Sequence, residues 1–228
     1  MAVATTPISS FMHLIHRVDH RVPEYLAEIE IRAAAAEMCS RAPVWRHVAE
    51  FSITTEDQAI PMPTYTPALT SVGAAITSIT KARWGADLRE LTPVAFDSDE
   101  AATPANGVDP SYFYLITDDH ITVAPFKAGT ITLHMTLKPV LGFDQKTMIA
   151  GAANPDLKYL PEFMLTHHAE TIANGALARL LTTVETEYSN PQAASIYMAK
   201  FEAAINALAG RALTGQQRVP LRVPSNWF

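Results

Sequence analysis

Residues 160–210 read LPEFMLTHHAETIANGALARLLTTVETEYSNPQAASIYMAKFEAAINALAG, and the rest of the chain is organised around this stretch. Apolar side chains recur every three or four residues on both sides of a break at 183–189, which predicts two antiparallel helices joined by a short loop. Asn190 and Pro191 form a typical helix start. The Asn side chain caps free backbone amides, and Pro fits the first turn because the N–H that it lacks would have no partner within the helix there. Gly210 is the expected end of the second helix. The residues expected to pack between the helices are Leu165, Ile172, Ala176, Leu180, Tyr197, Phe201 and Leu208.

The overall composition argues against several classes of protein, among them nucleic-acid-binding, disulfide-rich and membrane-spanning proteins. The chain has 228 residues and a net charge of −6, and an acidic chain is a poor candidate for holding nucleic acid through its phosphates. Its single cysteine, Cys39, excludes a disulfide framework and a Cys-based zinc site, and we expect a buried, inert thiol. Residues 1–10 do not resemble a secretion signal, and no apolar run is long enough to span a membrane. Synthesis in a reducing cytosol is therefore expected.

Outside residues 160–210 the period of the apolar side chains changes along the chain. Helical spacing predicts helices at 8–19 and 23–41. Two-residue alternation and β-branched side chains predict strands at 45–53, 72–81, 111–117, 121–126 and 130–138. The last three read as an antiparallel meander. In the third of them, one set of alternate side chains should face the core and the other should face water.

In the helix expected at 23–41, an acidic residue is followed four positions later by an arginine in two places. The two pairs are Glu28 with Arg32 and Glu37 with Arg41, and this spacing predicts weak ion pairs on an exposed helical face. Gly175, inside the first helix of the 160–210 hairpin, predicts a close approach of another helix.

The order of these elements predicts the fold class. Helices come first, strands follow and helices return, which favours an α+β fold in which the N- and C-terminal helices form a bundle with an inserted antiparallel β module. The expected divisions are N-terminal bundle helices at 1–43, the inserted module at 44–139, a long loop at 140–159, the helical hairpin at 160–210 and an extended tail at 211–228.

Three segments are too long to be connectors alone, namely 97–110, 139–159 and the tail at 211–228. Long loops in compact domains are usually functional or disordered. The tail is basic, contains no acid and ends in two aromatic residues, so we expect it to dock on a partner. Its candidate binding residues are Arg211, Arg218, Arg222, Trp227 and Phe228.

The most site-like cluster is His167, His168 and Glu170. Adjacent histidines on a helix point about 100° apart and cannot chelate one metal ion together, so exposed or interface histidines are the preferred interpretation. Asp118 and Asp119 lie between two expected strands and predict a turn. Phosphate-binding loops, nucleophile elbows and dinucleotide-binding turns are absent from the sequence. We therefore predict no catalytic, cofactor-binding or metal-binding residues and no enzymatic activity.

Two alternative hypotheses remain open from the residues alone. One is a β module that binds carbohydrate or protein, for example a fibre- or receptor-docking protein of a phage tail, in which exposed Trp84, Tyr112 and Tyr114 line a groove. Core packing of such aromatic residues is the commoner outcome. The other is a small hydrolase that uses His167 or His168.

Several sequence motifs resemble those of the head-to-tail adaptor, or connector, proteins of tailed bacteriophages. The most specific is IANGALARL at 172–180 followed by YSNP at 188–191 and Phe201. The supporting motifs are AAAAEMCS at 33–40 followed by Trp45, YFYL at 112–115, ITVAP at 121–125, TITL at 130–133 with Lys138-Pro139, and LPEF at 160–163. This chain departs from the family pattern at Met38, where the family has an aromatic residue, and in a longer 139–159 loop.

The resemblance implies a structural, non-enzymatic component of the virion neck, without a cofactor, made in the cytoplasm of the host bacterium. It implies a homo-oligomeric ring of about twelve copies that lies beneath the portal protein and extends the DNA channel. The implied partners are other copies of the chain, the portal protein and a tail nozzle, tube or tail-completion protein, with tail fibres as a further candidate. Packaged DNA would pass through the ring without sequence-specific binding, and no membrane is involved. The tail at 211–228 would reach the portal.

Overall fold

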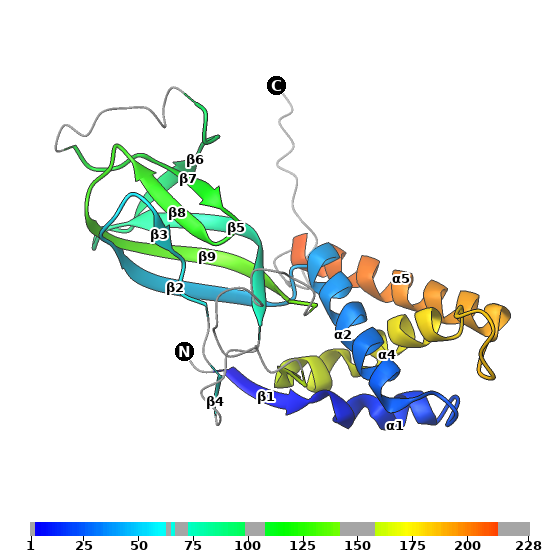
Figure 1. Ribbon diagram of the computed structural model, residues 1–228. Coiled ribbons are helices and arrows are strands. Elements are labelled where there is room, and N and C mark those ends of the chain that lie inside the picture. Colours follow the sequence, from blue (N-terminus) through cyan, green and yellow to red (C-terminus); the bar gives the residue numbers. More distant parts are fainter. Residues whose placement is uncertain (1–2, 63–64, 67–72, 99–107, 142–157, 214–228) are drawn as a thin grey trace, which may run out of the picture.

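The computed structural model describes residues 3–62, 65–66, 73–98, 108–141 and 158–213 (Figure 1). Its helices are η1 (Ile8–Phe11), α1 (Met12–His16), α2 (Glu24–Arg41), α4 (Glu162–Leu180) and α5 (Pro191–Leu213). Its strands are β1 (Val3–Pro7), β2 (Arg46–Ile53), β3 (Gln58–Ala59), β4 (Tyr65–Thr66), β5 (Ala74–Trp84), β6 (Arg89–Pro93), β7 (Tyr112–Thr117), β8 (His120–Ala124), β9 (Gly129–Pro139) and β10 (Tyr159–Pro161).

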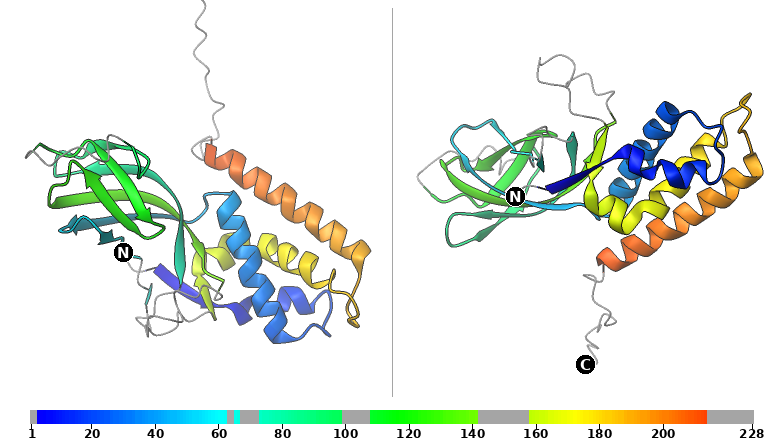
Figure 2. Two further views of the ribbon diagram at one scale, coloured as in Figure 1. Left: turned by 45° about the horizontal axis from the view of Figure 1, so that its top comes forward. Right: turned by 90° about the horizontal axis from the view of Figure 1, so that it is seen from below.

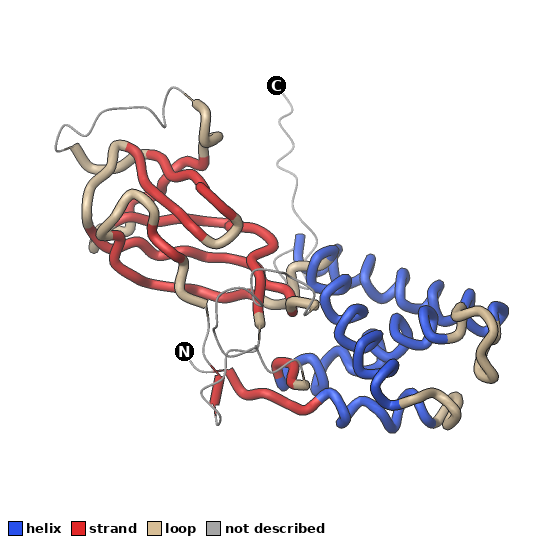
Figure 3. Tube along the Cα trace, in the orientation of Figure 1, coloured by secondary structure: helices blue, strands red, loops and turns tan. Residues whose placement is uncertain are grey.

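Seven strands form one sheet in the order β2-β9-β5-β6-β7-β8-β3. The long strand β9 pairs with both β2 and β5, and the β5–β9 register shifts twice. Such irregularities bend and twist a strand. The two edge strands, β2 and β3, are consecutive in the chain, so the short turn between them keeps the edges near each other and the sheet is nearly closed. A smaller sheet, β10-β1-β4, lies beside the helices (Figure 3).

The predicted fold class, a helical bundle with an inserted antiparallel β module, is wrong. Strands make up 32% of the described residues, which form a strand-rich, barrel-like fold with four α-helices in that part of the chain. The large sheet is mixed, because β6 and β7 pair in parallel, with Thr92 opposite Tyr112. Strands also lie outside the predicted module, because β1 near the N-terminus pairs with β10, which directly precedes α4. The sheet and the helices share one hydrophobic core. It includes Leu133 of β9 as well as Phe201 of α5, and both are fully buried.

The predicted meander of the last three strands is also wrong. β7 and β8 form an antiparallel hairpin, but β8 pairs on its other side with β3 and not with β9. The alternation of β9 was predicted correctly, since Ile131, Leu133, Met135 and Leu137 are all buried. At the N-terminus, the helix predicted at 8–19 is a 3₁₀ turn followed by α1, which ends at His16.

The helical hairpin is confirmed as α4 and α5, which lie side by side (Figure 2). The Asn190 side chain accepts a 3.1 Å hydrogen bond from the backbone N–H of Ala193, which is the predicted cap. The predicted stop at Gly210 is wrong, because α5 continues to Leu213. Of the expected packing residues, the buried ones are Ile172, Ala176, Leu180 and Phe201, and the partly buried ones are Leu165, Tyr197 and Leu208.

Gly175 is the point at which α2, α4 and α5 meet. A Cβ atom at this position would lie 2.7 Å from Cε2 of Phe201 and 2.9 Å from Cβ of Ala34. Real Cβ atoms do not approach other heavy atoms this closely, and Phe201 is fully buried. The predicted close helix contact is therefore confirmed, and a glycine is required there for lack of space.

Arg32 on α2 connects the helices with three other segments of the chain. Its side chain is buried, and the guanidinium donates hydrogen bonds to three backbone carbonyls: Nε to Val140 (2.5 Å), Nη1 to Tyr159 (3.0 Å) and Nη2 to Gly73 (3.4 Å). These carbonyls lie at the end of β9, in β10 and just before β5. The predicted ion pair between Arg32 and Glu28 on an exposed face is therefore wrong.

Substituting Gly175 by Ala should lower the free energy of unfolding by about 1–3 kcal/mol, because the added methyl group overpacks a site that Phe201 and Ala34 already fill. Gly210→Ala is the matched control, since a Cβ atom there meets nothing within 4 Å and α5 is helical at this point. It should raise stability by up to about 1 kcal/mol through helix propensity. Urea denaturation of both variants checks this, and equal effects would contradict the proposed crowding at Gly175.

Substituting Arg32 by Leu should lower the free energy of unfolding by about 3 kcal/mol, because three carbonyls lose a charged donor in a buried place. Arg32→Lys should rescue only part of this loss, since a compact ammonium cannot match the planar fork of a guanidinium. Exposed Arg17→Leu serves as the control and should change stability by less than about 0.5 kcal/mol. Denaturation monitored by circular dichroism measures all three, and a silent Arg32→Leu variant would refute the assigned role.

Candidate functional site

An open groove of ≈ 980 Å³ lies between the N-terminal half of α4 and the C-terminal half of α5. Its third side is the connection between α2 and β2, which contributes Pro43 and Val44. The groove is mixed in character, with apolar side chains alongside two histidines and an arginine. The residues that set this character are Phe163, His167, His168, Leu208 and Arg211.

The two histidines stand on successive positions of α4. Their ring centroids are 6.4 Å apart and nearly perpendicular, and the ring of Phe163 lies 6.1 Å from that of His168. Burial, with a smaller contribution from His167, lowers the pKa of His168, so the neutral imidazole is favoured at neutral pH. Within the described residues, no group of three His, Cys, Asp or Glu side chains could hold a metal ion. The histidines are placed as lining of the groove.

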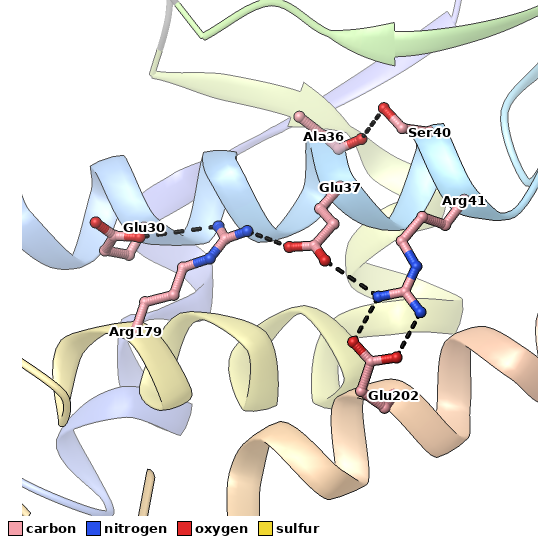
Figure 4. A network of polar contacts seen from close by, with 7 residues as sticks. All are labelled: Glu30, Ala36, Glu37, Ser40, Arg41, Arg179 and Glu202. Atoms are coloured by element: carbon pink, nitrogen blue, oxygen red, sulfur yellow. Dashed lines mark hydrogen bonds and ion pairs between the residues drawn. The ribbon is translucent and has the colours of Figure 1, made fainter. Parts of the chain in front are cut away.

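A chain of ion pairs fixes the three long helices relative to one another (Figure 4). Arg179 of α4 pairs with Glu30 of α2 (Nη1 to Oε2, 3.8 Å) and with Glu37 of α2. Arg41 of α2 contacts Glu37 (Nη1 to Oε1, 3.1 Å) and Glu202 of α5 (Nη1 to Oε1, 2.5 Å). The hydrogen bonds from Arg41 lower the pKa of Glu202. The predicted Glu37–Arg41 pair is thus confirmed, and it belongs to a network that joins α2, α4 and α5.

The aromatic groove of the alternative β-module hypothesis is not formed. Trp84 is only 6% exposed, and its indole covers Gly129, where a Cβ atom would lie 2.5 Å from Cζ2 of Trp84. Tyr112 and Tyr114 are partly buried, and the Tyr114 ring packs edge-on against that of Phe96 at 5.6 Å. Trp84 therefore packs in the core, the outcome that we considered commoner, and the exposed tryptophan that the alternative requires is not found.

Two smaller predictions about reactive side chains are confirmed. Cys39 is buried, and burial raises the pKa of its thiol to about 12, so the thiolate is not available as a nucleophile at neutral pH. Asp118 and Asp119 form the turn between β7 and β8. Within that turn, the Thr117 hydroxyl donates a 2.8 Å hydrogen bond to the Asp119 carboxylate.

Only part of the predicted tail site can be placed. Arg211 lies in the last turn of α5, exposed and beside the groove. Arg218, Arg222, Trp227 and Phe228 lie outside the described residues, as do the central parts of the loops expected at 97–110 and 139–159. Sequence reasoning missed the groove as a convergence of α4, α5 and residues 43–44. The only signal was the clustering of His167 and His168, which did not identify the other two sides.

In a comparison with protein families, residues 10–224 match the family described as "SU10 adaptor protein". Comparison with curated proteins gave no match. None of the helices in the described part of the chain is long and apolar enough to cross a membrane. The family match spans both the helices and the nearly closed sheet and so covers almost the whole fold. The chain therefore belongs to the SU10 adaptor family, a family of structural adaptor proteins of bacteriophages.

Proposed function

We propose that this protein is a ring-forming head-to-tail adaptor that joins the portal vertex to the tail and extends the channel through which DNA passes. The observation that carries the proposal is the adaptor-family match over residues 10–224. The proposed ring contains about twelve copies arranged by rotation about the channel. It lies in the neck of the virion, between the portal protein and a tail nozzle, tube or tail-completion protein, and tail fibres are a further candidate partner.

The contacts between the helices suit a rigid structural subunit. Gly175 lets three helices pack closely, the Arg41–Glu37–Arg179 network ties their surfaces together, and buried Arg32 joins them to the strands. Preorganised surfaces bind with less loss of conformational entropy than mobile ones do. A subunit of this kind can present its two ends to different partners while keeping their separation fixed.

The charge of the chain supports passage of DNA without retention. The net charge is −6, so a ring of such subunits repels phosphates on average and lacks the basic surface that sequence-independent binding requires. The tail is the exception, with Arg218 and Arg222 and no acid. We assign it to the portal, where arginines can meet acidic side chains and Trp227 and Phe228 can act as apolar anchors.

Removing residues 214–228 should abolish binding to the portal protein while leaving the fold intact, because α5 ends at Leu213. The double substitution Trp227→Ala and Phe228→Ala should weaken portal binding by about 30-fold or more, the usual effect of losing central aromatic anchors. Biolayer interferometry against purified portal rings measures both variants. Val184→Ala, which trims an exposed side chain on the α4–α5 loop, is the control and should bind like the wild type.

The position of the protein in the particle provides the direct test. Electron microscopy of purified virions should show its density in the neck, between the portal and the tail. Density on the capsid surface or at the distal end of the tail would refute the adaptor assignment, and unchanged portal binding after removal of 214–228 would refute only the role of the tail.

A further inference from the structure

The first two turns of α2 carry an exposed patch of two apolar side chains flanked by two acids. Tyr25 is 64% exposed and Ile29 is 47% exposed, and their spacing of four places them on the same face of the helix. Glu24 and Glu28 lie beside them, and neither acid has an ion-pair partner among the described residues. We call these four residues the α2 patch. A large exposed apolar pair of this kind, rimmed by charge, is typical of a protein–protein contact.

The groove between α4 and α5 has the complementary character. Phe163 and Leu208 give it apolar walls, and none of the described residues that line it is acidic. Arg211 is one of the lining residues. Arg46 lies next to the groove, and its Nε donates a 3.3 Å hydrogen bond to the carbonyl of the lining residue Pro43. Arg46 is exposed and has no carboxylate partner among the described residues. The groove can therefore accept apolar side chains accompanied by acids.

One copy of the chain cannot join its own patch to its own groove. The patch lies at the N-terminal end of α2, whereas the groove is lined by residues 43 and 44, just past its C-terminal end. A helix of 18 residues is about 27 Å long. Arg41 and Arg179 tie α2 to α5 and α4, so the two surfaces cannot swing together. An α2 patch that occupies the groove must therefore belong to another copy of the chain.

We infer that the α2 patch of one copy docks in the α4–α5 groove of the next, as the contact that closes the ring, an inference that rests on the proposed ring-forming function. Tyr25 is the aromatic anchor between the apolar walls, and Glu24 and Glu28 face Arg46 and Arg211. Because patch and groove are different surfaces, the contact is heterologous and repeats around a rotation axis. Every copy offers one patch and one groove, so a closed ring leaves neither exposed.

The decisive experiment mixes two variants that are each broken on one side of the contact. The patch variant carries Tyr25→Asp and Ile29→Asp. The groove variant carries Ala207→Trp, which fills the groove, and Arg46→Glu, which reverses its charge. All four positions are exposed, so both variants should fold, and circular dichroism checks this. Sedimentation velocity and native mass spectrometry measure their assembly, first alone and then with portal rings as a template.

The wild type should form rings, and each variant alone should form no patch–groove contact. An equimolar mixture should give 1:1 pairs and nothing larger, because only the intact groove of the patch variant and the intact patch of the groove variant can join. Val184→Asp, which places the same charge on a more exposed apolar residue, should assemble like the wild type. Rings from either broken variant alone, or a mixture that contains no pairs, would overturn the inference.

The result can be separated from the fate of the proposed function. Both variants keep residues 214–228, so each should still bind portal as a single subunit. Retained portal binding with unaltered rings would overturn the patch–groove contact and leave the adaptor assignment standing. A wild-type chain that neither binds portal nor assembles on it would overturn both.

Discussion

The architecture depends on one buried guanidinium. Arg32 reaches from α2 to carbonyls next to β5, β9 and β10, so a single side chain fixes the position of a helix against both sheets. A buried charge is costly unless it is fully hydrogen-bonded, which makes this arrangement sensitive to small displacements of any of the three carbonyls. Packing in the hydrophobic core, which extends from Leu133 in the sheet to Phe201 in α5, supplies most of the stability of the fold, but this packing is not directional. The hydrogen bonds of Arg32 are directional, and they fix the orientation of α2 relative to the strands.

The same helix has a second role at its surface. Glu37 and Arg41 form the network with α4 and α5, while Tyr25 and Ile29 remain exposed at the other end. Exposed ion pairs contribute little stability one by one. Their value here lies in geometry, because they hold the groove at a fixed distance from the patch. A subunit that closes a ring needs this constancy, since a small angular error repeated at every contact prevents closure.

Local sequence patterns predicted the elements better than their arrangement. Asn190 as a helix cap and the alternation of β9 depend on neighbouring residues and were predicted. The parallel pairing of β6 with β7 and the separation of β8 from β9 depend on residues distant in the chain, and no period encodes them. Arg32 shows the same limit. Its spacing from Glu28 fits an exposed ion pair, and only the tertiary fold shows that this side of α2 faces β9 and β10. The groove was missed because its three sides come from separate segments.

The pairing of β1 with β10 also affects how the protein is made. Thr5 lies opposite Pro161, so β1 lacks its partner until residue 161 has left the ribosome. α2 likewise lacks α4, against which it packs around Gly175. Contacts between such distant residues slow folding and expose apolar surface in the meantime. The strands from β2 to β9 are synthesised before α4 and α5, so cotranslational folding can begin in the sheet, and the helices can assemble on it once α4 and α5 have emerged.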